Sequence, residues 1–337
     1  GKVAEKQRTV NGEGRQGKGP DGGRPVRKML TVGGNLDRVT PPINIRNRRS
    51  GNFHMIDLHT HSNASDGKLK PAELMRHAHA AGIEVISLTD HDTLSGLDEA
   101  AREASKIGLE FIPGIEISAE YNPGTLHMLG YFIDPADADL IQTLTWLRGG
   151  RDDRNHIILD KLAALGCPLE WDEVAALAGG ESMGRPHIAR AMMDRGYVAS
   201  FEEAFERYLG KGAAAYVDRV KMTPELAIER IRSAGGLAVL AHPQTLSLSR
   251  EDLSDLLKRL SSLGLAGVEA YYYSHSDEET QLYISLAHRH GLTITGGSDF
   301  HGPGMIATRL GVGKGNMAIP RSVADDLARR HRSAHAS

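Results

Sequence analysis

The stretch MIDLHTHSNASDG, residues 55–67, is the most informative part of this chain. Its first four residues are typical of a short β-strand, and His59 and His61 follow at the strand's end. Side chains two positions apart on a strand point to the same side, so the two imidazoles project together. Asp66 lies five residues beyond. These three residues can form half of a metal site, although two neighbouring histidines also occur as ordinary surface residues.

The amino-acid composition limits which side chains can bind a metal and which cellular compartment the protein fits. The chain has 337 residues and a hydrophobic content of 40%, enough for a substantial core in one or two domains. The single cysteine, Cys167, excludes an intramolecular disulfide and a thiolate cluster, so any metal must be held by His, Asp and Glu. No apolar run approaches the roughly 20 residues of a membrane span, and the N-terminus lacks a signal-peptide core. We therefore expect a cytoplasmic protein without membrane association.

Charge is distributed unevenly along the chain. Residues 1–54 carry 12 Lys and Arg against 4 Asp and Glu, whereas the remainder carries 28 against 39. The basic segment is rich in Gly, Arg, Pro and Asn and has no hydrophobic period, so we expect a disordered leader or tag. It can contact nucleic acid, or it can be an extension that precedes a natural start at Met55.

Strand-like and helix-like segments alternate from Met55 onward. The predicted strands are Met55–His59, Glu84–Thr89, Glu110–Ile117, Thr125–Phe132, Leu237–Ala241, Gly267–Tyr271 and Thr293–Gly296. The predicted helices are Pro71–Ala81, Leu94–Ile107, Pro224–Ala234, Arg250–Leu263, Asp277–His290 and Ser322–Arg330. This pattern is typical of parallel strands with helical crossovers. Closed barrels of this α/β class place their chemistry at the C-terminal ends of the strands.

The alternation stops between residues 136 and 215. This segment is predicted to be helical throughout, with breaks near Gly149-Gly150, Gly166-Cys167-Pro168, Gly179-Gly180 and Gly210. An all-helical insertion that enters and leaves one α/β body is expected to form a cap over the active face. The predicted domains are therefore a barrel of residues 55–135 and 216–337 and a cap of residues 136–215.

Potential metal ligands gather at the ends of the predicted strands and in the first loop. They are His59, His61, Asp66, His91, Glu116, His127, His242, Asp299 and His301. Nine donors at this topological position indicate an active site. Asp90 and Asp92 flank one of them, and we expect both to orient His91 as hydrogen-bond acceptors.

The chemistry of these donors narrows the reaction. Oxygen and nitrogen ligands without sulfur suit Zn, Mn or Fe, and the abundance of imidazole argues against a site for Mg alone. Two or three adjacent divalent ions generate a hydroxide near neutral pH and neutralise charge on phosphoryl oxygens. Nothing in the sequence indicates a pocket for oxygen activation. The donor set therefore favours hydrolysis of phosphate esters.

The series DLHTHS, SDG, TDHDT, PGIEIS, LHMLGY, AHP and GSDFH resembles the PHP (polymerase and histidinol phosphatase) superfamily of metal-dependent phosphoesterases. The resemblance covers roughly residues 55–313 and implies a distorted (β/α)7 barrel with up to three metal ions and a metal-bridging hydroxide as nucleophile. It assigns His59, His61, Glu116 and Asp299 to one ion, Glu116, His127 and His242 to a second, and Asp66, His91 and His301 to a third. We also expect Glu116 and Asp299 to be catalytic residues, so that Glu116→Ala or Asp299→Asn abolishes activity.

The predicted cap carries a second motif. Residues 184–190, GRPHIAR, resemble the cap motif of the branch that contains 3′,5′-nucleoside bisphosphate phosphatases and a 5′-to-3′ exoribonuclease of short RNAs. Arg185 offers a planar donor fork for a phosphate. His187 can donate beside it or protonate a leaving oxygen, as a catalytic residue. His275, which follows three tyrosines, can also bind substrate, although those tyrosines can equally cover a barrel rim.

Two departures from that branch leave the substrate open. The branch usually carries a Lys shortly before its Tyr-Val, whereas residues 212–217 are GAAAYV, and it commonly has His-Pro-Gly where this chain has His242-Pro243-Gln244. We predict hydrolysis of small nucleotides or short oligoribonucleotides, without an obligate protein partner. The alternatives are an AMP phosphatase, a histidinol-phosphate phosphatase, and a nucleic-acid-associated binding module whose metal site is structural.

Overall fold

A computed structural model describes residues 55–178, 183–218, 221–305 and 308–336. The leader predicted over residues 1–54 lies outside this range. Seven strands pair in the order of the sequence. They are β1 (Met55–Asp57), β2 (Ile83–Leu88), β3 (Glu110–Ala119), β4 (Leu126–Tyr131), β5 (Leu237–Leu240), β6 (Gly267–Tyr272) and β7 (Thr293–Gly297). All seven predicted strands are confirmed, with small differences at their ends.

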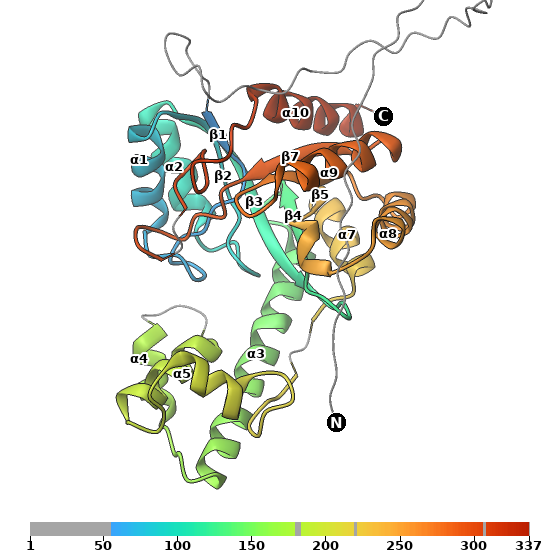
Figure 1. Ribbon diagram of the computed structural model, residues 1–337. Helices are drawn as coiled ribbons and strands as arrows, with labels where there is room; N and C mark the ends of the chain where they lie inside the picture. The colour runs from blue at the N-terminus through green and yellow to red at the C-terminus, as the bar shows by residue number, and fades with distance from the viewer. Residues whose placement is uncertain (1–54, 179–182, 219–220, 306–307, 337) are drawn as a thin grey trace, which may run out of the picture. The chain divides into compact units, whose positions relative to one another are not determined.

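The sheet curves into a nearly closed barrel (Figure 1). The backbone N–H of Leu58 donates to the carbonyl oxygen of Gly296 at 3.2 Å, and that of His61 donates to Phe300 at 2.9 Å. These bonds join the chain that follows β1 to β7 and to the segment after it. The first and last strands of the sheet therefore meet at the end where the predicted ligands lie.

The expectation that all strands are parallel is wrong for β4. It pairs antiparallel with both β3 and β5, whereas the other neighbouring strands are parallel. Residues 120–125, which join β3 to β4, are too few for a helical crossover, and a short connection of this kind reverses the chain direction. The start of β4 therefore lies at the same edge of the barrel as the C-terminal ends of the other strands.

The helices around the barrel also follow the prediction. They are α1 (Pro71–Ala80), α2 (Leu97–Ile107), α7 (Pro224–Ser233), α8 (Arg250–Ser262), α9 (Asp277–Arg289) and α10 (Arg321–His335), and a 3₁₀ turn, η2 (Pro243–Leu246), was not predicted. Thr223 caps α7 by accepting from Leu226 N, with Pro224 in the first turn. Apolar residues fill the space between sheet and helices, and a second cluster fills the barrel interior, where Val323 and Leu327 of α10 close the end opposite the site.

The segment predicted as a cap is helical, but its longest helix differs from the prediction. The structure has α3 (Ala138–Ala164), α4 (Trp171–Ala178), α5 (Arg185–Asp194), α6 (Phe201–Ala204) and a π-helical turn, η1 (Phe205–Leu209). The break predicted at Gly149-Gly150 is wrong, because α3 runs through it. Each glycine disfavours a helix by only about 1 kcal/mol, and packing at both ends of α3 outweighs this. Its first half contributes Leu140 and Leu144 to the main core, and its second half contributes Ile158 and Leu162 to a separate core.

No helix in the described ranges combines the length and the apolar character needed to cross a membrane.

Candidate metal centre

Glu116 of β3 lies at the centre of the predicted ligands. Its side chain is 1% exposed. One carboxylate oxygen, Oε1, lies 2.7 Å from His127 Nδ1 and 3.0 Å from His242 Nε2. The other, Oε2, lies 3.2–3.3 Å from ring nitrogens of His59, His61 and His91. The two oxygens of Glu116 therefore face two different sets of histidines.

Local backbone structure brings these side chains together. Glu116 N donates to the carbonyl of Asp90, and Asp92 N donates to that of Glu116, so His91 is held beside β3. His127 lies near the start of β4, and it reaches the site because β4 runs antiparallel to β3. His242 directly follows β5 and has a φ of 22°. Such backbone strain in a residue other than glycine is concentrated at functional sites.

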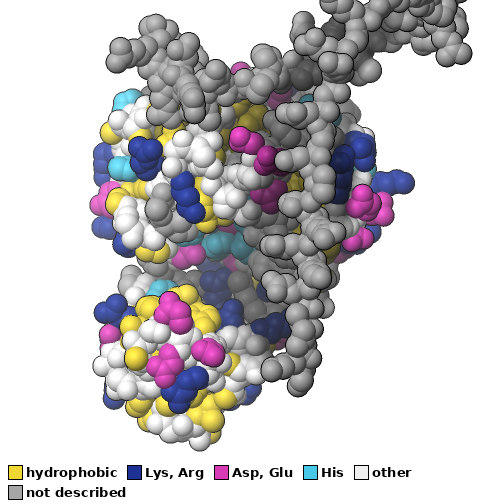
Figure 2. Space-filling model, in the orientation of Figure 1, with side chains coloured by type: hydrophobic (Ala, Val, Ile, Leu, Met, Phe, Trp, Pro, Cys, Tyr) yellow, Lys and Arg dark blue, Asp and Glu magenta, His cyan; other side chains and the backbone are white. Residues whose placement is uncertain are grey.

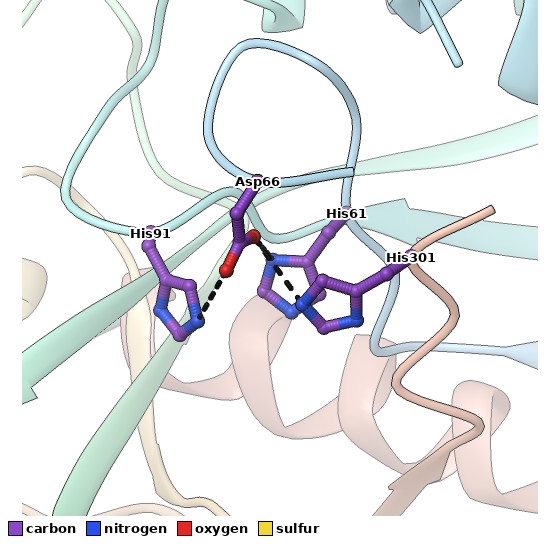
Figure 3. A group of neighbouring side chains, drawn as sticks. All are labelled: His61, Asp66, His91 and His301. Carbon is purple, nitrogen blue, oxygen red and sulfur yellow. Dashed lines mark ion pairs between the residues drawn. The ribbon is translucent and has the colours of Figure 1, made fainter. Parts of the chain in front are cut away.

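Asp299 and Asp66 complete the cluster from two loops. Asp299, whose φ is 53°, follows β7, and its Oδ1 lies 3.0 Å from His61 Nε2 and 3.4 Å from His59 Nε2. Asp66 lies in the first loop between ring nitrogens of His301, at 3.2 Å, His61, at 3.7 Å, and His91, at 3.8 Å (Figure 3). Figure 2 shows a group of histidine side chains, in cyan, near the middle of the view with acidic side chains beside it.

The residues fit divalent cations. Three groups each bring their ligand atoms within 4.8 Å of one another: His59, His61, Glu116 and Asp299; His61, Asp66, His91 and His301; and His91, Glu116 and His127. Both ring nitrogens of His61 and Nδ1 of His91 are buried, and the carboxylate oxygens 3.0–3.7 Å from them are not oriented for a hydrogen bond. Buried polar atoms of this kind need a partner, and a cation between imidazole and carboxylate supplies one.

These groups agree only partly with those implied by the resemblance. The group of His59, His61, Glu116 and Asp299 is the set implied for the first ion. The group around Asp66 contains His61 in addition to the residues implied for the third ion. The group around His127 contains His91, where the resemblance implies His242. His242 belongs to none of the three groups, although its Nε2 lies near Glu116. All nine predicted donors nevertheless lie in one continuous cluster.

Electrostatics show that the carboxylates require positive charge. Burial raises the pKa of Glu116, but the surrounding histidines, His91 and His127 foremost, hold it well below the usual range. The pKa of Asp299 is also held well below the usual range, by His59 and His61, against the same effect of burial. Burial lowers the pKa of His61, yet the carboxylates raise it to about 10. Charge compensation therefore governs this site.

Glu269 of β6 supports the centre through hydrogen bonds to His59 and to the backbone of His242, and the sequence does not single it out as a site residue. Its side chain is fully buried. Oε1 accepts a hydrogen bond from His59 Nδ1 at 2.9 Å, and Oε2 accepts one from the backbone N–H of His242 at 2.8 Å. A carboxylate that holds the far nitrogen of a ligating imidazole orients the ring and raises its basicity. The only sequence signal was a charged residue within an apolar strand.

The role predicted for Asp90 and Asp92 is wrong. Asp90 accepts hydrogen bonds from Ser62 N, Ser62 Oγ and Ser65 Oγ at 2.5–2.7 Å, so it holds the loop that carries Asp66. Asp92 accepts from Ser118 N at 3.0 Å and pairs with Arg151 Nη2 of α3 at 2.8 Å. The two aspartates thus fix the surrounding backbone and α3 rather than the ring of His91.

The three predicted substrate residues differ in their surroundings. Arg185 Nη1 donates to the carbonyl of Leu209 at 2.9 Å, and its guanidinium lies 5.8 Å from the Phe205 ring and 5.6 Å from the Tyr216 ring. Arg185, Phe205 and Leu209 lie within the predicted cap, and Tyr216 is the first residue after it.

His187 is half-buried at the first turn of α5. Its Nδ1 accepts from Gly184 N at 3.1 Å, so its proton is on Nε2. Burial lowers the pKa of His187, and the nearby carboxylate of Asp66 opposes that shift.

His275 is 5% exposed, and its ring lies 5.1 Å from that of Tyr272 and 4.8 Å from that of Tyr283. It lies in none of the three ligand groups.

Comparisons with known proteins identify the family of this chain. A family model described as the PHP domain matches residues 57–298. A 5′-3′ exoribonuclease of Haemophilus influenzae is 37% identical, with 73% of this chain and 90% of that protein covered. A 3′,5′-nucleoside bisphosphate phosphatase of Chromobacterium violaceum is 36% identical, with 74% and 88% covered. A solved structure of an amidohydrolase from C. violaceum, with bound sulfate and no metal, superimposes with a TM-score of 0.70 at 34% identity, over 82% of this chain and 96% of that one.

Proposed function

The chain belongs to the PHP domain family, and from this premise we propose that it is a metal-dependent hydrolase of phosphate esters in small nucleotides. The substrates proposed are 3′,5′-nucleoside bisphosphates, short 5′-phosphorylated oligoribonucleotides, or both. Relatives bearing each of these two activities in their names match about three quarters of this chain, and about nine tenths of their own length is covered.

The observation that carries the proposal is the position of Glu116 between two sets of histidines. A carboxylate whose two oxygens face separate donor groups is suited to bridge two cations. Glu116 would hold one ion together with His59, His61 and Asp299, and a second ion together with His127 and with His242, whose Nε2 lies 3.0 Å from Oε1. Asp66, His91 and His301 would hold a third ion. We propose two to three ions of Mn, Fe or Zn, because the donors are imidazole and carboxylate.

Divalent ions held in this way lower the pKa of bound water and neutralise charge on a phosphoryl group. The chain itself contributes orientation. Glu269 fixes the ring of His59, and the Ser62–Asp90 contact fixes the loop of Asp66. His187 would donate its Nε2–H to a substrate phosphate, since its Nδ1 is engaged with Gly184 N. Arg185 would bind a second phosphate or the nucleotide from within the cap, which we propose comprises residues 136–215.

A substrate screen tests this function. Metal-free protein is reconstituted with Mn²⁺, Fe²⁺ or Zn²⁺ and assayed against a 3′,5′-bisphosphate, AMP, a short 5′-phosphorylated RNA and histidinol phosphate. We expect metal-dependent turnover, with kcat/KM highest for the bisphosphate or the RNA. Highest turnover of AMP or histidinol phosphate, or equal turnover after metal removal, would contradict the proposal.

A further inference from the structure

Strand β6 contributes no proposed metal ligand, yet two of its side chains reach the proposed ligands. Glu269 binds His59 and His242 N, as described above. Tyr272 donates from its hydroxyl to Asp299 Oδ2 at 2.8 Å. These residues are three positions apart. Side chains alternate between the faces of a regular strand, so an unbroken β6 would point them to opposite sides.

A β-bulge at Ala270 resolves this conflict. Glu269 pairs with Thr295 and Tyr271 pairs with Gly296, so two steps along β6 match one step along β7 and Ala270 is the extra residue. A bulge of this kind shifts the alternation of faces by one and often re-aims a side chain next to an active site. Gly296 is suited to this register, because a Cβ there would lie 2.4 Å from the Cβ of Tyr271.

His275 holds the bulged segment. Its Nδ1–H donates to the carbonyl oxygen of Ala270 at 2.9 Å, and its backbone N–H donates to the carbonyl of Tyr272 at 3.1 Å. The imidazole packs against the rings of Tyr272 and Tyr283. A 95% buried histidine that satisfies the carbonyl of the extra residue explains why the bulge is stable at this position.

The hydroxyl of Tyr272 determines how Asp299 presents its carboxylate. Oδ2 accepts the hydrogen bond from Tyr272, whereas Oδ1 lies 3.0 Å from His61 Nε2 and 3.4 Å from His59 Nε2. Only Oδ1 therefore faces the donors of the first proposed ion. Tyr272 is 6% exposed, so water does not readily replace this bond.

We propose that His275 and Tyr272 are positioning residues for Asp299: His275 stabilises the bulge at Ala270, and the bulge directs the Tyr272 hydroxyl so that Oδ1 of Asp299 faces the residues that would hold the first ion. His275, expected from the sequence to bind substrate, acts instead through Tyr272. This inference rests on the proposed metal site and concerns its assembly, not its substrate.

Calorimetric titration of the metal-free protein with Mn²⁺ tests the contacts from His275 through Tyr272 to Asp299. Tyr272→Phe removes only the hydroxyl, and we expect about tenfold weaker binding of one ion, as for other residues that orient metal ligands. His275→Leu removes the donor to Ala270, and we expect weakening in the same direction. His275→Asn, whose side-chain amide can donate in place of Nδ1, should restore most of the affinity. Tyr273→Phe, which removes a neighbouring hydroxyl, is the matched control and should bind like wild type.

The double variant distinguishes positioning from independent structural effects. If His275 acts through Tyr272, then Tyr272→Phe/His275→Leu binds Mn²⁺ within about twofold of the weaker single variant, because coupled residues are not additive. Additive losses, or wild-type affinity in Tyr272→Phe, overturn the proposal. If His275→Leu does not fold, Tyr272→Phe is compared with His275→Asn instead. An equal loss of Mn²⁺ affinity in these two variants overturns the role of His275. Absence of Mn²⁺ binding by the wild type would instead overturn the proposed metal site.

Discussion

Glu269 Oε1 and His59 Nδ1 form a hydrogen bond of 2.9 Å between two fully buried side chains. The bond fixes which nitrogen of His59 faces Glu116. Because Glu269 also accepts from the backbone of His242, one carboxylate orients ligands proposed for two different ions. We therefore expect the two ions to respond together to a change at Glu269.

Glu269→Gln tests this dependence. The amide can still accept from His59, but its NH₂ group would then face the N–H of His242, so the two donors oppose each other. We expect roughly 10–100-fold weaker metal affinity, measured by calorimetry and by metal content after dialysis. Glu278→Gln, an exposed glutamate in the first turn of α9, is the control and should retain wild-type affinity. Full metal content in Glu269→Gln would contradict the role assigned to this residue.

Metal binding should release protons at neutral pH. The carboxylates raise the pKa of His61 to about 10 and that of His59 well above its usual value, although burial lowers both. Both rings are therefore protonated near pH 7 in the metal-free protein, and Glu116 and Glu269 also raise the pKa of His242 against the effect of burial, so a cation must displace about two protons or more in total. His91 releases none, because burial lowers its pKa to about 4. Calorimetry in buffers of different ionisation enthalpy measures this number, and release of no proton would contradict the charge compensation described above.

The same shifts predict the pH dependence of stability. For His61 the folded-state pKa lies above the unfolded value, so its contribution is complete below about pH 6.5 and is lost as the pH rises toward 10. Metal-free protein should accordingly lose stability across this window in urea unfolding. Saturation with Mn²⁺ should reduce the loss, since the cation takes over the charge compensation. A flat profile for the metal-free protein would argue against protonated His61.

The ion pair between Arg151 of α3 and Asp92 links the predicted cap helix to the barrel. Its nitrogen–oxygen distance is 2.8 Å, and the two side chains are 11% and 1% exposed. Arg151→Met would leave a buried carboxylate without this guanidinium, so we expect a loss of about 3 kcal/mol in the free energy of unfolding. The exposed pair Arg190–Asp194 offers the control, because Arg190→Met should change stability by less than about 1 kcal/mol. Equal effects of the two substitutions would show that burial of the first pair is irrelevant.

His187→Gln separates hydrogen bonding from proton transfer. Glutamine can place an N–H near the position of His187 Nε2 but cannot act as an acid. If His187 only binds a phosphate, kcat should stay within about tenfold of wild type while His187→Ala raises KM. A general acid would instead lose about 10²–10⁴-fold in kcat in both variants. Nδ1 of His187 accepts the N–H of Gly184, so the ring does not take up a second proton there to become the imidazolium that a general acid would use. We therefore expect the result for a residue that only binds phosphate.

Much of the fold was predictable from the sequence, because alternating periods, Pro at helix starts and polar residues after strands are local signals. His127 lies beside the other predicted donors, but for a reason that the sequence does not indicate. It lies near the start of a strand, and the antiparallel pairing of β4 depends on its neighbours in space. The continuity of α3 through Gly149-Gly150 was also missed, because packing at both ends of the helix outweighs the local preference.

The residues that orient the ligands were harder to predict. Glu269 and Tyr272 stand on a strand without proposed ligands, and their shared direction arises from a bulge that no local pattern indicates. His275 stood out in the sequence as a polar residue after a strand, but its partner is a backbone carbonyl. Asp90 was assigned to the neighbouring His91, whereas the fold directs it to Ser62 and Ser65. The roles of most of these residues thus depend on contacts between segments that are distant in the sequence, and neighbouring residues in the sequence do not reveal them.

The most direct test of the central claim is phosphate release by Glu116→Gln with saturating Mn²⁺ and a 3′,5′-bisphosphate. Glu120→Gln, an exposed glutamate just beyond the end of the same strand, is the matched control. We expect wild-type kcat in the control and a loss of more than about 100-fold in Glu116→Gln, which exceeds the usual effect of residues that only orient ligands. Activity within tenfold of wild type in Glu116→Gln would contradict a centre built around this carboxylate.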